Sequence, residues 1–179
     1  MKATGIVRRI DDLGRVVIPK EIRRTMRIRE GDPLEIYTGP EGEVVFKKYS
    51  AMGELENAAE ACEVISKLGG APAVIFDRDH VVAVSGTQKK EYSERRISAA
   101  LEDLLEQRSS YSAASDGAPL KPIEGIDSRA IAMTPIISAG DVAGAVAFVS
   151  NGGDDVKAND RHVMLTKVAA MFLGKQIES

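Results

Sequence analysis

The sequence predicts a two-domain protein, with a small all-β N-terminal domain that carries one short helix and a larger α+β C-terminal domain. Three observations support this division. The 179-residue chain is long enough for two small domains. Short β-branched runs separated by turn residues fill the first fifty positions, whereas longer helical repeats of apolar residues follow. Charge is also unevenly divided, since residues 1–53 carry 11 basic and 8 acidic side chains and residues 54–179 carry 13 and 19.

This charge division gives the first domain a net charge of +3 and the second a net charge of −6. Nine of the basic residues fall within the first thirty positions. A basic head on an acidic body suggests that the head binds nucleic acid.

The chain begins with two predicted strands around a turn. Residues 4–10 alternate in side-chain direction, and the β-branched run at 16–18 extends the second strand, residues 15–18. Asp11, Asp12 and Gly14 supply the turn chemistry between them.

Residues 19–27 are predicted to form a short amphipathic helix. Pro19 suits the first helical position, and Glu21 is favoured in the first turn by the helix dipole. Ile22 and Met26 share one side, and the basic residues share the other at i, i+3, i+4 and i+7: Lys20, Arg23, Arg24 and Arg27. About nine residues are too few for a stable isolated helix, so the apolar side must pack. The basic side is then either a phosphate-binding surface or a solvated face.

A connector at 28–33, with Gly31 as a plausible helix-end residue, leads to a predicted hairpin. Its strands are residues 34–38 and 43–48, and Gly39-Pro40-Glu41-Gly42 forms the turn. A unit of about fifty residues has few apolar side chains for a core of its own. We therefore expect an obligate homodimer, whose two-fold symmetry would present two basic helices to two half-sites on duplex DNA.

The single cysteine, Cys62, excludes an internal disulfide framework and fits a reducing cytoplasm. Its alanine-rich surroundings predict a buried apolar role. The N-terminus has no apolar leader, and no segment approaches ~18 uninterrupted apolar residues. We expect a cytoplasmic protein with no membrane contact, no cofactor and no metal.

Residues 54–70 are expected to link the two domains through an amphipathic helix at 53–68 that ends at Gly69-Gly70. This helix either packs in the core or forms a junction between subunits. In the second domain, residues 71–179, strands are predicted at 73–77, 80–85, 129–137 and 142–150, and helices at 93–107 and 159–177. The last helix is expected to turn Val163, Met164, Val168, Met171 and Phe172 inward.

Few residues of the second domain suggest ligand chemistry. His80 and His162 are isolated and are expected at turns or on the surface, and Asp77 and Asp79 suit a turn better than a metal site. The polar loop 109–125, near Arg108 and Lys121, is the expected place for a ligand gate.

Motifs for catalysis are missing from the sequence. No serine has glycines two residues away on both sides, as a nucleophile elbow requires. Phosphate-binding glycine loops and two-histidine zinc helices are also missing. The sequence therefore predicts a protein that is not an enzyme.

The N-terminal motifs closely resemble the swapped-hairpin domain of AbrB-type transition-state regulators. The resemblance covers about the first fifty residues and rests on Thr4-Gly5-Ile6-Val7-Arg8, Leu13-Gly14-Arg15-Val16-Val17-Ile18-Pro19, Glu21, Arg23-Arg24, Leu34-Glu35-Ile36-Tyr37 and Lys47-Lys48-Tyr49. It implies that two chains interleave hairpins into one barrel and contact DNA through Arg8, Arg15, Arg23 and Arg24. Lys20 departs from the usual pattern after the proline and either contacts phosphate or lies in solvent. The candidate DNA-binding residues are therefore Arg8, Arg15, Lys20, Arg23, Arg24 and Arg27.

This resemblance also implies activation and repression of sporulation genes in spore-forming bacteria, with the protein on the nucleoid of the forespore. Residues 1–53 contain no Asn or Gln, the side chains best suited to adenine. We therefore expect the protein to recognise DNA by shape and by arginine contacts.

The element order of the second domain resembles a GAF domain, a sensory module. We expect it to sense an unknown small molecule, or to assemble dimers into a homotetramer. Three alternatives stay open: an antitoxin-like DNA-binding partner protein, a ligand-binding sensor module with no enzymatic activity, and a ligand-binding enzyme with a DNA-binding appendage.

Overall fold

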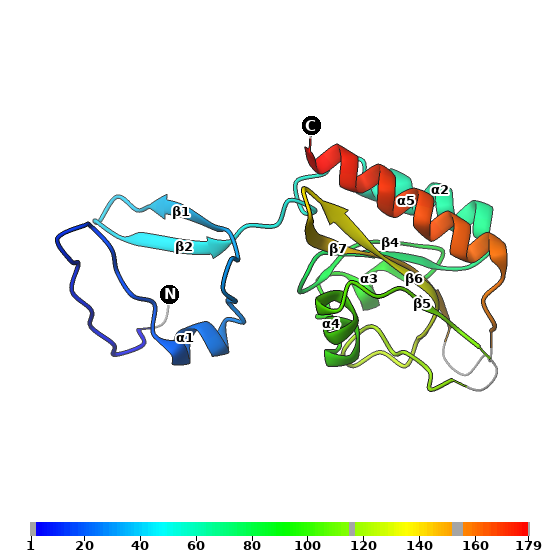
Figure 1. Cartoon of the computed structure of the whole chain (residues 1–179), viewed down its shortest axis with the longest axis horizontal. Coiled ribbons are helices and arrows are strands. Elements are labelled where there is room, and N and C mark those ends of the chain that lie inside the picture. Colours follow the sequence, from blue (N-terminus) through cyan, green and yellow to red (C-terminus); the bar gives the residue numbers. More distant parts are fainter. Residues whose placement is uncertain (1–2, 115–116, 152–155, 179) are drawn as a thin grey trace. The chain divides into compact units, whose positions relative to one another are not determined.

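A single antiparallel hairpin supplies the strands of the N-terminal unit. The computed structural model describes residues 3–114, 117–151 and 156–178, and the chain divides into one unit up to Tyr49 and another from Ser50. In the first unit, β1 (Leu34–Thr38) pairs with β2 (Val44–Lys48), as Figure 1 shows. The Gly39 amide closes the turn by donating to the Glu43 carbonyl at 2.9 Å. The predicted second hairpin is confirmed.

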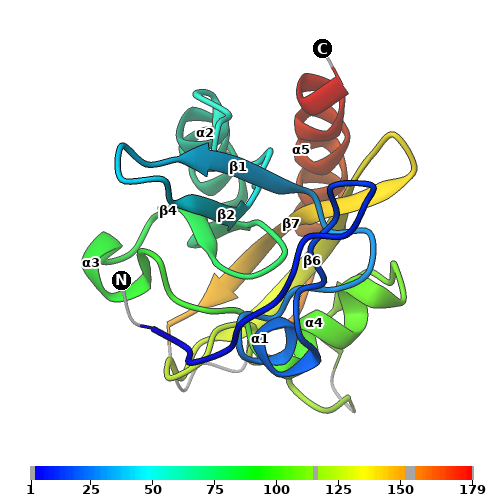
Figure 2. The same ribbon diagram turned by 90° about the vertical axis from the view of Figure 1, so that its left-hand side faces the viewer.

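Residues 4–10 and 15–18 differ from the prediction, because neither segment forms a strand in the chain. They run as a plain blue trace into and out of a turn (Figure 2). The turn itself is present, with the Asp11 amide donating to the Arg15 carbonyl at 3.1 Å. A strand needs a series of backbone hydrogen bonds to a neighbour, and within the described part of this one chain the two segments have only that bond at Arg15.

The helix α1 (Lys20–Thr25) is shorter than the nine residues predicted. It ends in a Schellman motif, in which the Ile28 amide donates to the Arg23 carbonyl at 2.8 Å and the Arg27 amide to the Arg24 carbonyl at 3.3 Å. Arg27 takes the left-handed conformation that this motif requires, with φ of 52°. The predicted place of Arg27 on the helical stripe is therefore wrong.

The second unit is built on a five-stranded antiparallel sheet with the order β4-β3-β7-β6-β5 (Figure 1). Its strands are β3 (Ala73–Phe76), β4 (Val81–Ser85), β5 (Tyr111–Ser112), β6 (Arg129–Ser138) and β7 (Asp141–Ser150). The α+β fold class is confirmed. The predicted loop 109–125 contains β5, whose two residues pair with β6.

Helices cover both faces of this sheet (Figure 1). On one face lie α2 (Ala58–Gly69) and α5 (Asp160–Glu178), and on the other α3 (Lys89–Tyr92) and α4 (Ala99–Glu106). The helix α3 was not predicted from the sequence. The helix α4 begins later than predicted, because the Ser98 hydroxyl caps it by accepting from the Leu101 amide at 3.2 Å.

The side chains of the central strands alternate between the two faces of the sheet and pack into two hydrophobic cores. Ile75 and Phe148 pack under α2 and α5, whereas Val74 and Phe76 pack toward α4. Gly69 lets α2 approach the sheet, because a Cβ there would collide with the Phe148 ring. The linking helix expected at 54–70 is thus packed within the second unit, against β3, β4 and α5.

The orientation predicted for α5 is wrong. His162, Thr166 and Leu173 face the protein, together with small alanine and glycine side chains. Four of the five residues expected to turn inward are exposed instead: Met164, Val168, Met171 and Phe172. Small residues suit the sheet side because they allow the helix axis to lie close to the sheet.

Candidate nucleic-acid interface

An aspartate organises the N-terminal turn. The Asp11 Oδ1 accepts hydrogen bonds from the Leu13 amide at 3.0 Å and the Arg15 amide at 2.8 Å. Gly14 takes a φ of 75°, which glycine adopts without strain. This local network fixes the turn although its side chains are exposed.

The same carboxylate holds the Arg15 side chain. Its Oδ2 atom lies 2.7 Å from Arg15 Nε, and the arginine side chain is 70% exposed. The backbone hydrogen bond from Arg15, followed by the one from its side chain, lowers the pKa of Asp11 below the ordinary value of 3.8. Arg15 therefore has an oriented guanidinium group whose outer edge faces solvent.

The basic face of α1 is also open to solvent. Lys20, Arg23 and Arg24 are exposed, whereas Ile22 on the opposite side is half-buried. Arg8 is exposed on the extended segment before the turn. Arg27, in the left-handed residue after the helix, is half-buried. Thus five of the six candidate residues are exposed, and Arg27 differs in both backbone conformation and burial.

A lysine of the hairpin fastens the end of α1. Lys48 Nζ donates to the Arg27 carbonyl at 2.9 Å and lies 3.6 Å from Asp32 Oδ2. The Asp32 side chain is only 3% exposed, and its Oδ2 also accepts from the Arg29 amide at 2.8 Å. This cluster joins the helix, the connector and β2, and the sequence alone gave no signal for it.

Little apolar surface is buried in this unit. Among the described residues up to Tyr49, Pro19 alone is buried. Val7 is 89% exposed and Val17 72%, and Leu13, Ile10 and Phe46 are exposed as well. Monomeric proteins rarely expose contiguous apolar surface on this scale.

The other residues that stood out in the sequence have structural roles. Cys62 is buried as predicted; burial raises the pKa of its thiol to about 12, and its Sγ lies 3.1 Å from the Ala73 carbonyl. Asp77 forms the predicted turn, accepting from the Asp79 and His80 amides at 2.7 Å each. His162 is buried, contrary to expectation, with Nε2 3.1 Å from the Gly69 carbonyl.

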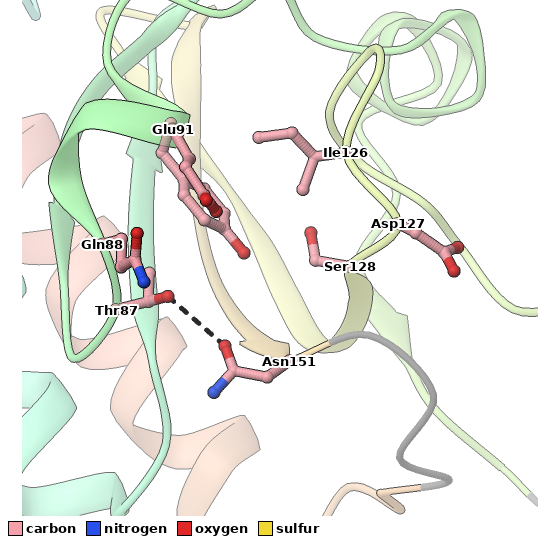
Figure 3. A pocket seen from close by; sticks show the side chains of 8 residues that line it. Thr87, Gln88, Glu91, Ile126, Asp127, Ser128 and Asn151 are labelled. Carbon is pink, nitrogen blue, oxygen red and sulfur yellow. Dashed lines mark hydrogen bonds between the residues drawn. The ribbon is translucent and has the colours of Figure 1, made fainter.

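A cleft in the second unit was missed by the sequence analysis. It has a volume of about 600 Å³ and is lined by the two residues before α3, the last two residues of α3, the 126–128 segment and Asn151 (Figure 3). The described residues of the loop expected to gate a ligand, 109–125, do not line it. Lys121 lies 2.6 Å from Asp127, and Arg108 4.0 Å from Asp141.

Comparison with known proteins shows the family to which this chain belongs. Residues 54–178 match the family described as "Stage V sporulation protein T C-terminal, transcription factor". Stage V sporulation protein T of Bacillus subtilis (strain 168) is 49% identical over 181 residues, which cover 99% of each chain. The chain belongs to the stage V sporulation protein T family. This membership confirms the expected class of protein, a transcription regulator of sporulation genes.

Each unit is also similar to other known proteins. Residues 7–52 match the family described as "Antidote-toxin recognition MazE, bacterial antitoxin". The N-terminal DNA recognition domain of the transition-state regulator AbrB from Bacillus subtilis is 60% identical, over 28% of this chain and 92% of that one, with a TM-score of 0.24. The cofactor-binding GAF domain of the nutrient sensor CodY from Clostridium difficile is 11% identical, over 67% of this chain and 83% of that one, with a TM-score of 0.45.

The residue ranges of the two family matches disfavour the antitoxin alternative. The match to the antitoxin family ends at residue 52, whereas residues 54–178 match the transcription-factor family. No helix in the described ranges is both long and apolar enough to span a membrane. Within those ranges no group of three or more potential metal ligands comes together.

Proposed function

We propose that this protein is a homodimeric transcription regulator that binds double-stranded DNA through arginines of the N-terminal turn and α1. The observation that carries the proposal is the set of exposed guanidinium groups beside apolar side chains that one chain leaves uncovered. The proposed contact residues are Arg8, Arg15, Lys20, Arg23 and Arg24, with Arg27 less accessible.

A second copy of the chain would cover the exposed apolar residues. Residues 4–10 have the alternation of a strand and residues 15–18 have a β-branched run, but neither forms a ladder in this chain. Pairing with another chain would satisfy their backbone groups and bury Val7 and Val17. Fifty residues without disulfides or metal usually need such association. The resemblance to AbrB-type domains supports an interleaved arrangement.

Arginine suits the proposed contacts because its planar fork binds phosphate through two hydrogen bonds. Asp11 restricts Arg15 before any DNA arrives, which lowers the ordering cost of the contact. The AbrB relative is named as a DNA recognition domain, which supports the same assignment. With two copies related by two-fold symmetry, the contacts would repeat at two half-sites.

The second unit is proposed to assemble dimers into a homotetramer and to sense a small molecule. The outer faces of α2 and α5, which pack against each other, carry six exposed apolar side chains: Val64, Leu68, Met164, Val168, Met171 and Phe172. Such a two-helix surface fits its own copy in a four-helix arrangement. The family resemblance supports a further part of the proposal, a cytoplasmic, nucleoid-bound location in the forespore.

Fluorescence anisotropy of labelled duplex DNA across a range of salt concentrations tests DNA binding. The slope of log affinity against log salt should be steep, and Arg15→Ala or Arg23→Ala should make it shallower by about 2, one unit for each copy of the residue. Arg108→Ala, an exposed arginine of the second unit, is the matched control and should leave the slope unchanged. If neither Arg15→Ala nor Arg23→Ala changes the salt dependence of DNA binding, the assignment is wrong.

A further inference from the structure

The cleft of the second unit contains a buried hydroxyl group without a hydrogen-bond partner. Ser128 is 1% exposed, and its Oγ is one of two buried side-chain polar atoms in the described residues for which no partner is found. Figure 3 shows Ser128 and Ile126 on one side of the space and Thr87, Gln88 and Asn151 on the other. Native proteins pair nearly all such groups, so an unpaired one at a cleft indicates a missing partner.

The remaining lining supplies further neutral hydrogen-bonding groups. Thr87, Gln88 and Asn151 contribute a hydroxyl and two amides, and the Thr87 and Asn151 side chains are held 3.3 Å apart by their own hydrogen bond. Ile126 and the ring of the buried Tyr92 add apolar surface. Several convergent polar groups on an apolar base, in a volume of about 600 Å³, are typical of small-molecule sites.

The charged side chains that line the cleft indicate which ligand charge it favours. No lysine or arginine lines the cleft among the described residues, and two carboxylates do. Asp127 pairs with Lys121 at 2.6 Å, which lowers the pKa of that carboxyl, and its side chain points away from Ser128 (Figure 3). Among the described residues of the lining, Glu91 is therefore the carboxylate that has no ion-pair partner. An anionic ligand would be repelled, and a cationic amine would gain.

We propose that this cleft binds a small polyhydroxylated molecule without anionic groups, preferentially one that carries an amine, in the manner of an amino sugar. Ser128 Oγ donates to or accepts from a ligand hydroxyl, and Glu91 on α3 receives the ammonium group. This inference rests on the sensing role proposed above. It is tested by binding at the cleft, which does not depend on DNA.

Three matched probes separate the charge classes: glucosamine, glucose and glucosamine 6-phosphate. Added at millimolar concentration to the full-length protein below neutral pH, glucosamine should shift the backbone amide NMR signals of Thr87, Ser128 and Asn151. Glucose should shift the same signals with weaker affinity, and the phosphorylated sugar least. Equal or stronger binding of the phosphorylated sugar, shifts confined to other surfaces, or no response to any probe would each overturn the proposal.

Two variants connect this response to the named residues. Ser128→Ala should weaken glucosamine binding by roughly threefold to tenfold, and it should leave the melting temperature of the free protein unchanged or raised, because it removes an unpaired buried hydroxyl. Ser66→Ala is the matched control, since that buried hydroxyl donates to the Ala71 carbonyl at 2.9 Å on the other sheet face. It should lower the melting temperature and leave glucosamine affinity intact.

Glu91→Gln tests the charge preference at an exposed position where misfolding is not expected. It should remove the preference for glucosamine over glucose, a change of roughly tenfold. Glu94→Gln, a nearby exposed glutamate outside the lining, should keep that preference. If Ser128→Ala and Glu91→Gln both bind glucosamine as the unmodified chain does, the hydroxyl is satisfied by water alone and the assignment is wrong. Failure of DNA binding would leave these measurements unaffected.

Discussion

Lys48 donates a hydrogen bond from its Nζ to the backbone carbonyl of Arg27 at 2.9 Å. The bond joins two residues 21 positions apart, one after α1 and one at the end of β2. The acceptor is the carbonyl of a residue in the left-handed conformation just after the helix, where no further helical N–H group is present to donate to it. The position of the basic helix within the N-terminal unit is thereby tied to the hairpin.

Replacing Lys48 with methionine tests this tie while keeping most of the apolar stem. We expect DNA affinity to fall several-fold and the free energy of unfolding to fall by about 1.5 kcal/mol, since a charge-assisted hydrogen bond is lost. The salt slope should stay unchanged, because the residue is not a proposed phosphate contact. Lys47→Met is the control, because that lysine of the same strand lies over the Tyr37 ring at 4.5 Å. Equal losses in both variants would contradict the role of Lys48.

The turn at Asp11 should depend on pH. Hydrogen bonds from Arg15 hold the pKa of Asp11 below 3.8, so the charged carboxylate stabilises the turn. That contribution is complete above the ordinary pKa and is lost as the pH falls through the lowered pKa of the folded state. The Leu13 and Arg15 amide NMR signals should therefore titrate together with a midpoint below 3.8.

Substitution of the aspartate provides the control for that titration. In Asp11→Asn the shared transition should disappear, because an amide oxygen does not titrate. A midpoint at or above the ordinary value in the unmodified protein would show that the network does not favour the carboxylate.

Gly144 marks a close approach between β7 and its neighbour β3. A Cβ at this position would collide with the Phe76 carbonyl oxygen. Gly144→Ala should lower the free energy of unfolding by about 1–3 kcal/mol, measured by urea denaturation, because the strands must separate to admit a methyl group. Gly53→Ala, where the nearest atoms lie at 3.4 Å, should change it little. An unchanged midpoint for Gly144→Ala would mean that the sheet relaxes without cost.

The outer face of α5 should control assembly beyond the dimer. Val168 and Met171 are exposed apolar residues, so Val168→Glu combined with Met171→Glu should place charges in the proposed tetramer interface. Light scattering should then report dimers in place of tetramers, with DNA binding per dimer retained. Gln107→Glu adds a charge at the exposed end of α4, on the other sheet face, and should leave the mass unchanged. A protein already dimeric before substitution would exclude this interface.

Local patterns in the sequence predicted the turn at Asp11, the 34–48 hairpin and most strands of the second unit. These elements depend on neighbours in sequence, such as Gly39 at a turn, so short-range chemistry is sufficient to find them. The end of α1 was missed because a Schellman motif at Arg27 uses arginine where glycine is usual. The face of α5 was mispredicted because its large apolar residues lie outside and its small residues pack on the sheet.

The sequence by itself determined the family of this protein, its two-part organisation and the basic residues of its head, because motifs and charge are properties of single segments. Tertiary structure decided which of those residues are accessible, how Lys48 fastens α1, and that Ser128 meets Thr87 and Asn151 at one cleft. Those relationships join segments tens of residues apart. Their geometry follows from how the sheet and helices pack, and no local pattern in the sequence records it.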